Sequence, residues 1–455
     1  MTVLWDNAIK ANQREFKYSV NIYFDGNTNP PINFTEDIVT SIDLLEETFA
    51  ESQTPLGAVS SNELTIYLYN EDKQFSPKYI SSSYYGKLVP NIKIEASVGI
   101  KVIDGTYEYT DLGTFYTTDW DAPTDSLIAS VICHDRLFNF FNLPMPQLPI
   151  QEEINMASMF TMLFNVLGLT TTDYEIDNIA YGISIAALPE SSELNIRDGM
   201  QQMAERSLVN VFVTRKGIIR VLRNNNVESI SHTWTDSNMI IKADIPQKYS
   251  NIYSQAEIAY HIPFVGEQVS VFTIESIEIP TNGLILNNLL FSSVVGDVEN
   301  VQLIDATNSY IDSMTIGARS ISLTIANTGV PEDVSIAIYG RLIDTIDAKY
   351  TETDSVAQTL VGSIKFAFDS EYIQSKTDAI TYAEKILPLV TTPDAYITIN
   401  SRGNPSIILT NSMLINDIID QIVGLEIVPI RMHYNFTNGL SCDTVGINKS
   451  VRELV

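Results

Sequence analysis

Short runs in which apolar and polar residues alternate recur through the first third of the chain, and they restrict its fold to strands with one buried face. The clearest run places Leu64, Ile66 and Leu68 between Thr and Tyr neighbours, and residues 92–98 repeat the pattern. An Asp-Gly pair at residues 104–105 is typical of a hairpin turn, because both residue types tolerate positive φ. We therefore predict an antiparallel β domain that extends to about residue 144.

Two amphipathic helices are predicted after a cluster of prolines. Residues 156–169 have apolar side chains at helical spacing, and Gly168 suits the C-cap of such a helix. A second helix begins after Asn195, which is a favoured N-cap residue. It leads into two short apolar runs separated by Arg215-Lys216-Gly217, a sequence that predicts a hairpin turn. Together these elements predict a small α/β module.

The rest of the chain returns to β patterns. Residues 274–365 carry few charges, and a turn sequence at residues 327–329 separates two alternating runs. A third helix is predicted near residues 379–387, and we expect Pro388 to stop it. Because 455 residues exceed the roughly 250–300 at which a single core stops growing, several domains are expected.

The charge balance limits the partners of this chain. Asp and Glu number 56 against 27 Lys and Arg, which gives a formal net charge of −29. This excess repels nucleic-acid phosphates and anionic membranes. Cys133 and Cys442 resemble neither a metal cluster nor a redox pair, so no disulfide framework and no cofactor are expected. The first residues lack a signal-peptide pattern, and no apolar stretch is long enough to span a bilayer.

The sequence shows no constellation for catalysis or metal binding. Residues 182–186 lack the final Gly of a nucleophile elbow, so Ser184 is interpreted as an ordinary strand residue. The four histidines are scattered singly, without a partner at metal-ligand spacing. Asp119, Asp121 and Asp125 do not fit a Ca²⁺ loop and are interpreted as a solvated turn.

Two clusters of charge each allow two interpretations. The basic tip Arg215-Lys216 would contact a phosphate or an acidic neighbour, but such a tip is more often hydrated. An acidic run at residues 34–51 contains no Lys or Arg. In a monomer it would be a solvated strand face, and its functional interpretation depends on what the chain is. Its carboxylates are Glu36, Asp37, Asp43, Glu46, Glu47 and Glu51.

Several turn sequences follow one another in a fixed order. The strand at residues 63–69 runs into Asn70-Glu71-Asp72 and Phe75-Ser76-Pro77, and Tyr84-Tyr85-Gly86-Lys87-Leu88-Val89-Pro90 follows. The order continues with Gly113-Thr114-Phe115-Tyr116, Trp120-Asp121 and Cys133-His134-Asp135-Arg136-Leu137. This succession resembles the first tube-like domain of bacteriophage tail hub proteins.

The resemblance extends over most of the chain. Residues 197–221 are similar to the family's helix-hairpin module, and residues 320–342 to its inserted β domain. Residues 379–405, which end in Gly403-Asn404-Pro405, and residues 438–442 are similar to its second tube-like domain. The chain departs from the family at Thr410-Asn411, where Gly-Asp is frequent.

The fold implied by the resemblance is mainly β with α+β parts and has several domains. It combines two tube-like antiparallel β-barrel domains with a small α/β module and an inserted β-sandwich-like domain. The implied boundaries are residues 1–147 for the first tube-like hub β domain, 148–225 for the helix-hairpin module, 226–272 with 366–455 for the second tube-like domain, and 273–365 for the inserted β domain.

The resemblance also implies a structural, non-enzymatic role in the virion. Three copies would form a homotrimer with a pseudo-sixfold ring that joins the hexameric tail tube or distal tail ring to the trimeric tip. The other implied partners are a central spike or tip protein, the tape measure protein and DNA that passes without specific binding. No membrane insertion is implied, and assembly would take place in the host cytoplasm.

A channel through such a ring gives the acidic run a function. Charges more than roughly 8 Å apart are screened in water, so only carboxylates on the channel wall act on DNA. We therefore hypothesise that part of the run lines the channel. The candidates are Glu36, Asp37, Asp43, Glu46 and Glu47.

Two other classes of function compete with the hub. A peripheral receptor-binding or carbohydrate-binding tail protein would use exposed aromatic platforms, which the 22 Tyr leave open. A tail-tip hydrolase is disfavoured by the missing catalytic constellation, and we expect no turnover of purified peptidoglycan. The mass of the assembled particle separates these possibilities, since a trimer indicates a hub and a hexamer indicates a tube or distal-ring protein.

Overall fold

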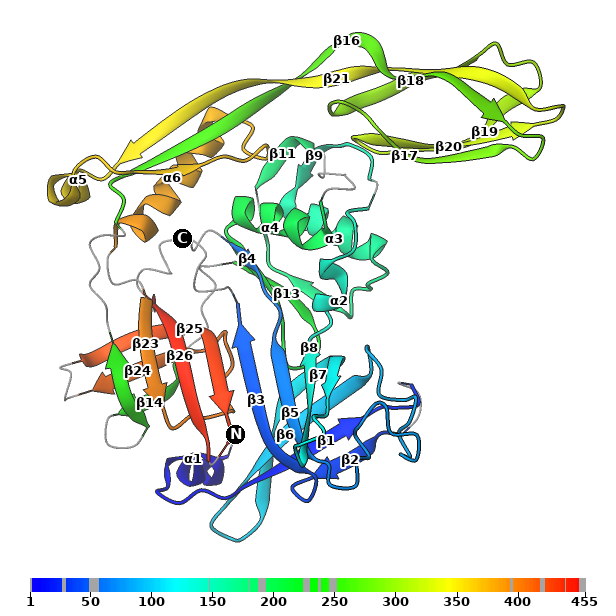
Figure 1. Ribbon diagram of the computed structural model, residues 1–455. Helices are drawn as coiled ribbons and strands as arrows, with labels where there is room; N and C mark the ends of the chain where they lie inside the picture. The colour runs from blue at the N-terminus through cyan, green and yellow to red at the C-terminus, as the bar shows by residue number, and fades with distance from the viewer. Residues whose placement is uncertain are drawn as a thin grey trace.

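Figure 1 shows a computed structural model of the chain. It describes residues 2–26, 30–48, 57–146, 148–179, 181–186, 194–223, 230–235, 239–244, 252–392, 396–417, 422–437 and 439–449. Two halves rich in β-sheet lie at one end of the molecule, an α/β module lies in the middle, and a long arm crosses the opposite end. The prediction of a mainly β chain with smaller helical parts is confirmed.

The first β half is an antiparallel sheet preceded by one short helix. Leu64, Ile66 and Leu68 are fully buried, as their alternation predicts. Gly105 has a φ of +88° in the hairpin turn predicted at residues 104–105. The elements are α1 (Val3–Lys10), β1 (Phe16–Ile22), β2 (Ile32–Thr35), β3 (Val39–Glu47), β5 (Glu63–Tyr69), β6 (Lys93–Lys101), β7 (Tyr107–Asp121) and β8 (Ile128–His134).

The α/β module contains both helices that the sequence predicts before residue 210. The Asn195 side chain accepts a hydrogen bond of 2.9 Å from the Asp198 amide and so caps the second of them, as expected. Gly168 has a φ of +77° just after the first, where a C-cap glycine belongs. The elements are β4 (Ala58–Val59), α2 (Phe138–Phe141), β9 (Gln151–Asn155), α3 (Met156–Val166), β10 (Tyr174–Ile176), β11 (Gly182–Ala186), α4 (Ile196–Ser207), β12 (Val209–Val213) and β13 (Ile219–Arg223).

The arm, residues 255–353, is built on one long two-stranded ribbon. Its strands β16 (Gln255–Ile279) and β21 (Glu332–Thr353) pair along their lengths, with register shifts at three places. At the tip, two sheets enclose a core that includes Ile321, Leu323 and Ile336. The tip strands are β17 (Leu284–Leu290), β18 (Val295–Ile304), β19 (Ser309–Ile316) and β20 (Ser320–Asn327). The base packs against α5 (Ser355–Val361), β22 (Lys365–Phe368) and α6 (Lys376–Thr391).

The second β half is assembled from segments on both sides of the arm. Its strands are β14 (Ile230–Thr235), β15 (Ile240–Asp244), β23 (Tyr396–Ser401), β24 (Ser412–Asp417), β25 (Ile422–Asn435) and β26 (Ser441–Asn448). β14 pairs with β24 in parallel, and the other pairings in this half are antiparallel. The main sheet runs in the order β15-β23-β26-β25-β3-β5-β8-β7-β6-β1-β2, so it continues into the first β half.

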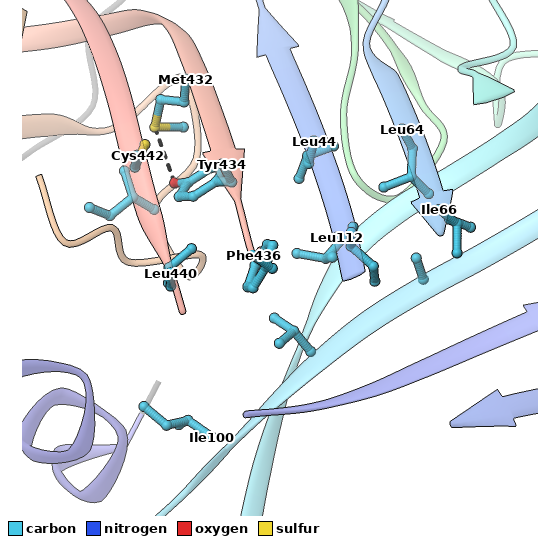
Figure 2. Packing of buried hydrophobic residues seen from close by; sticks show 14 of the residues in the cluster. Leu44, Leu64, Ile66, Ile100, Leu112, Met432, Tyr434, Phe436, Leu440 and Cys442 are labelled. Atoms are coloured by element: carbon cyan, nitrogen blue, oxygen red, sulfur yellow. Dashed lines mark hydrogen bonds between the residues drawn. The ribbon is translucent and has the colours of Figure 1, made fainter. Parts of the chain in front are cut away.

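One hydrophobic core serves both β halves. Figure 2 shows Leu44, Leu64 and Leu112 of the first half in the same cluster as Tyr434 and Phe436 of the second. Burial of this shared apolar surface favours the two halves staying together. The α/β module and the arm have separate clusters of their own.

Three features differ from the sequence predictions. The helix expected to stop at Pro388 continues to Thr391, because Leu389 and Val390 are buried against the base of the arm. Asp119 and Asp121 belong to β7 rather than to a turn, since both lie in its pairing with β8. The predicted boundary between residues 272 and 273 falls inside β16, where pairing with β21 carries the strand through. The other domain boundaries stay predictions.

Candidate functional site at the joint of the two sheets

The two β halves are joined by backbone pairing between β3 and β25. Asp43 lies opposite Asn435, and the register continues to Glu47 opposite Arg431. Two further hydrogen bonds extend the contact, from the Thr48 amide to the Ile430 carbonyl (2.7 Å) and from the Phe436 amide to the Ile42 carbonyl (3.0 Å). We call the paired residues 43–47 and 431–435 the joint. They make the two halves one sheet (Figure 1).

Strand alternation gives the joint one buried face and one polar face. Leu44, Glu46 and Tyr434 point into the shared core, whereas Asp43 and Glu47 lie on the other face and are half-buried. Residues directly opposite each other on neighbouring strands share a face of the sheet. The pairing of β3 with β5 and of β25 with β26 therefore adds residues of β5 and β26 to the polar side. Its charged, imidazole and amide side chains are those of Asp43, Glu47, Glu63, Arg431, His433, Asn435 and Asp443, and Leu45 and Thr65 share this face, which we call the polar face.

On the buried face, Glu46 forms a two-pronged ion pair with Arg215 from the hairpin of the α/β module. The Nε of Arg215 donates to Glu46 Oε1 over 2.7 Å, and the side chains of Glu46 and Arg215 are only 5% and 11% exposed. Burial disfavours the charged guanidinium, but the carboxylate outweighs this effect and raises the pKa of Arg215. The acidic-neighbour interpretation of this basic tip is therefore correct for Arg215, whereas Lys216 is exposed, as the hydrated interpretation expects.

Arg215 also binds the loop that contains Gly403-Asn404-Pro405. Its guanidinium donates to the carbonyls of Pro405 and Ile407, and to that of Asp111 in β7. One side chain thus connects the module to both β halves. Arg suits this position better than Lys, because its planar guanidinium carries five N–H donors in a fixed arrangement and can bind a carboxylate through two of them.

The chain's N-terminal segment holds the same loop from another direction. Trp5 is fully buried, and its Nε1 donates to Asn404 Oδ1 over 3.1 Å. Arg14 donates to the carbonyls of Arg402 (2.6 Å) and Leu440 (2.7 Å). Burial and the nearby Arg402 lower the pKa of Arg14 to about 10. Gly403 has a φ of +73°, and a Cβ there would lie 2.9 Å from a carbon of Leu440, so the glycine is needed for both reasons.

The five predicted channel carboxylates are therefore not equivalent. Asp43 and Glu47 share the polar face, whereas Glu46 lies on the buried face against Arg215. Glu36 and Asp37 are exposed in the turn between β2 and β3, where Glu36 pairs with Lys17. Glu51 lies outside the described residues.

Sequence reasoning did not single out Glu63 and Asp443 as members of this face. Glu63, on β5, lies opposite Leu45, and Asp443, on β26, lies opposite His433. Alternation alone places each on the outward side of its strand, but which strands become neighbours depends on pairing between segments far apart in the sequence. The available signal was the strand pattern that begins at Glu63.

Two groups on the polar face have shifted pKa values. A hydrogen bond of 2.6 Å from His433 Nε2 to Asp43 Oδ1 raises the pKa of the imidazole above its ordinary 6.5. Burial raises the pKa of Glu47, and this outweighs the opposite effect of Arg431. Asp43 also accepts a hydrogen bond of 2.9 Å from Asn435, so its carboxylate is held by β25 on two sides.

The His433 contact predicts a pH-dependent joint. Because the folded-state pKa is raised, the stabilisation is complete below about pH 6.5 and is lost as pH rises through the folded-state value. The difference in unfolding free energy between the natural chain and His433→Gln should therefore shrink from about pH 6 to about pH 9, measured by urea denaturation. Asp43→Asn should show the same trend. A difference that grows with pH would contradict the assignment.

Among the residues that the structure describes, no group of three or more His, Cys, Asp or Glu side chains is placed to hold a metal ion. None of the helices described is long and apolar enough to cross a membrane. Cys133 and Cys442 are both buried free thiols.

Comparison with solved structures gives the architecture a context. The tail protein from Neisseria meningitidis MC58 superposes with a TM-score of 0.54 and 9% identity, covering 96% of this chain and 98% of that one. The 43 kDa tail protein of prophage MuSo2 from Shewanella oneidensis gives a TM-score of 0.53 and 8% identity, covering 96% and 99%. The chain has the phage tail protein fold. No protein-family model and no curated protein matches its sequence.

The tail protein fold covers nearly the whole chain, so the arm and the α/β module belong to it as much as the two β halves do. At identities below 10% this likeness concerns the fold. The function of the joint is therefore inferred from its own geometry.

Proposed function

We propose that this chain is the hub subunit of a phage tail tip or baseplate. Three copies would form a ring in which the two β halves of each chain occupy successive positions. The observation that carries the proposal is the joint, which makes two β units of one chain lie side by side in one sheet. Three such chains present six units, which matches a trimeric tip to a hexameric tube or distal tail ring.

The polar face is the surface that we propose for the channel wall. Its carboxylates Asp43, Glu47, Glu63 and Asp443 would repel the phosphates of passing DNA, in line with a net charge of −29. Asp37, exposed beside β3, and Glu36 would extend the acidic surface. Glu46 would contribute through Arg215 to the shape of the wall rather than to its charge, since its carboxylate is buried and paired.

The proposed partners follow from this position. The ring would contact a distal tail or tail tube protein on one side and a central spike or tip protein on the other, with the tape measure protein ending in its lumen. The subunit would be part of the virion and would act as a structural component rather than an enzyme. The peripheral receptor-binding alternative lacks a comparable observation.

Particle mass tests the proposal directly. Sedimentation or mass photometry of the purified chain should give a mass three times that of one chain, and mixing it with its tail ring should add three chain masses to that of the ring. A hexamer would instead indicate a tube or distal-ring protein, and a chain that stays monomeric beside its ring would indicate a peripheral one. Cryo-electron microscopy of the trimer should then place Asp43 and Glu47 on the lumen, and finding them on the outer surface would refute the channel assignment.

A further inference from the structure

A short segment, residues 369–375, connects the arm to the α/β module, and we call it the connector. On the module side, Arg206 Nε donates to the Tyr372 carbonyl over 2.9 Å. Gln374 donates to the Ile185 carbonyl over 2.6 Å and accepts from the Ile185 amide over 3.0 Å. These bonds hold the connector to the module and involve no residue of the arm.

On the arm side, the connector follows β22, which pairs with β16, and it is also held by His261 of β16. The His261 amide donates to the Ile373 carbonyl over 2.8 Å. The ring then lies between two carboxylates, with Nδ1 at 2.8 Å from Asp347 Oδ1 on β21 and Nε2 at 2.6 Å from Asp369 Oδ1 on the connector. Arg319, near the arm tip, adds an ion pair of 2.9 Å to Glu371.

These two ring contacts require a particular protonation state. An ionised carboxylate only accepts hydrogen bonds, and a neutral imidazole carries one N–H. With a neutral ring, one nitrogen lone pair would therefore face a carboxylate oxygen without a proton between them. Only the imidazolium donates from both nitrogens, so the geometry is that of the charged ring.

The charged groups around His261 favour its protonated form. The ring lines a cavity of about 390 Å³ between the arm, the connector and Ile185 of the module. The charged groups around the ring are Asp344 and Asp347 on β21, Asp369 and Glu371 on the connector, and Arg319 from the tip. Burial lowers the pKa of His261, but the hydrogen bonds to Asp369 and Asp347 outweigh it and raise the pKa overall.

We propose that His261 is a proton-dependent latch that fastens the arm to the connector. Below its folded-state pKa the imidazolium ties β16, β21 and the connector together. As pH rises through that value, one of the two carboxylate contacts is lost, which weakens the attachment of the arm to the connector. The imidazole is only 17% exposed, but the carboxylates are 70% and 72% exposed, so solvent limits the effect to about fivefold for each contact.

Hydrogen exchange of the full chain tests the latch. The readout is protection of the peptides that cover residues 259–265 and 369–375 at about pH 6 and about pH 9, corrected for intrinsic exchange rates. In the natural chain we expect protection to fall by up to about fivefold at the higher pH. In His261→Gln it should be low at both pH values, because the single NH2 group of the Gln side chain cannot take the places of both ring nitrogens between Asp347 and Asp369.

Asp369→Asn provides the sharper variant. Its side-chain amide donates to the unprotonated Nε2 of a neutral ring, so the contact to the connector survives at high pH and the pH dependence of exchange should disappear. Asp312→Asn, which makes the same change at an exposed position of β19, is the matched control and should keep the natural pH dependence in these two peptides. Equal protection of the natural chain at both pH values, or an unchanged pH dependence in Asp369→Asn, would overturn the latch.

Discussion

Replacing Arg215 with alanine is expected to destabilise the fold by about 3–5 kcal/mol, because the change leaves the buried Glu46 carboxylate without its counter-ion. The carbonyls of Pro405 and Ile407 also lose a donor from that guanidinium. The effect should appear as a lower urea midpoint for unfolding of the shared core. Tryptophan fluorescence reports on this core, since Trp5 and Trp234 lie inside it and Trp120 packs against it.

The adjacent residue supplies the control for this experiment. Lys216 occupies the same hairpin tip but is exposed, so Lys216→Ala should change stability by less than about 0.5 kcal/mol. A double variant, Arg215→Met with Glu46→Leu, removes both charges and should be more stable than Arg215→Ala. If Arg215→Ala and Lys216→Ala shifted the midpoint equally, Arg215 would not connect the module to the β halves as described.

Replacing Trp5 with alanine should cost about 3–5 kcal/mol, the range for emptying a large buried aromatic site. Trp5 is fully buried in the shared core and reaches Asn404 in the second β half, although α1 precedes the first. Its loss should weaken the contact between the two halves. Thermal unfolding followed by circular dichroism measures the effect, since the variant loses one of the three tryptophans.

Two further substitutions define what Trp5 contributes. Trp5→Phe keeps much of the volume but removes the indole N–H; Asn404 Oδ1 still accepts from Ser406, so the cost should stay near 1–2 kcal/mol, roughly one hydrogen bond and a small cavity. Val3→Ala on the same helix, where the side chain is 74% exposed, should have almost no effect. Both substitutions introduce Ala, the best helix former, so helix propensity cannot cause a loss; a loss for Val3→Ala equal to that for Trp5→Ala would show that burial of Trp5 does not account for the result.

The sequence predicted much of the local structure because local signals decide it. Alternation identified the strand from Glu63, and cap chemistry identified the helix after Asn195. Pro388 was misjudged because its effect depends on burial of the two residues that follow, which is a tertiary property. The boundary placed at residue 272 falls inside β16 for a similar reason, since the partner strand of β16 comes after residue 331.

Less of the candidate site than of the fold could be predicted from the sequence. The acidic run was visible in the sequence, but the division between Glu46 and its neighbours depends on two partners that lie far away. Arg215 is separated from Glu46 by 169 positions, and His433 from Asp43 by 390. Alternation could have assigned the two faces of β3, but no local pattern reveals which face meets an arginine and which meets a histidine.

The continuous ribbon of the arm has a mechanical consequence. At about 3.3 Å for each residue, the 25 residues of β16 span about 80 Å. A rotation of about 10° at the base would carry the tip through about 14 Å on that length. The arm is thus a lever whose short end lies at the connector. A modest force on the distant tip is delivered as a larger one at the base, where the pairing of β16 with β22 and the packing of α6 resist it.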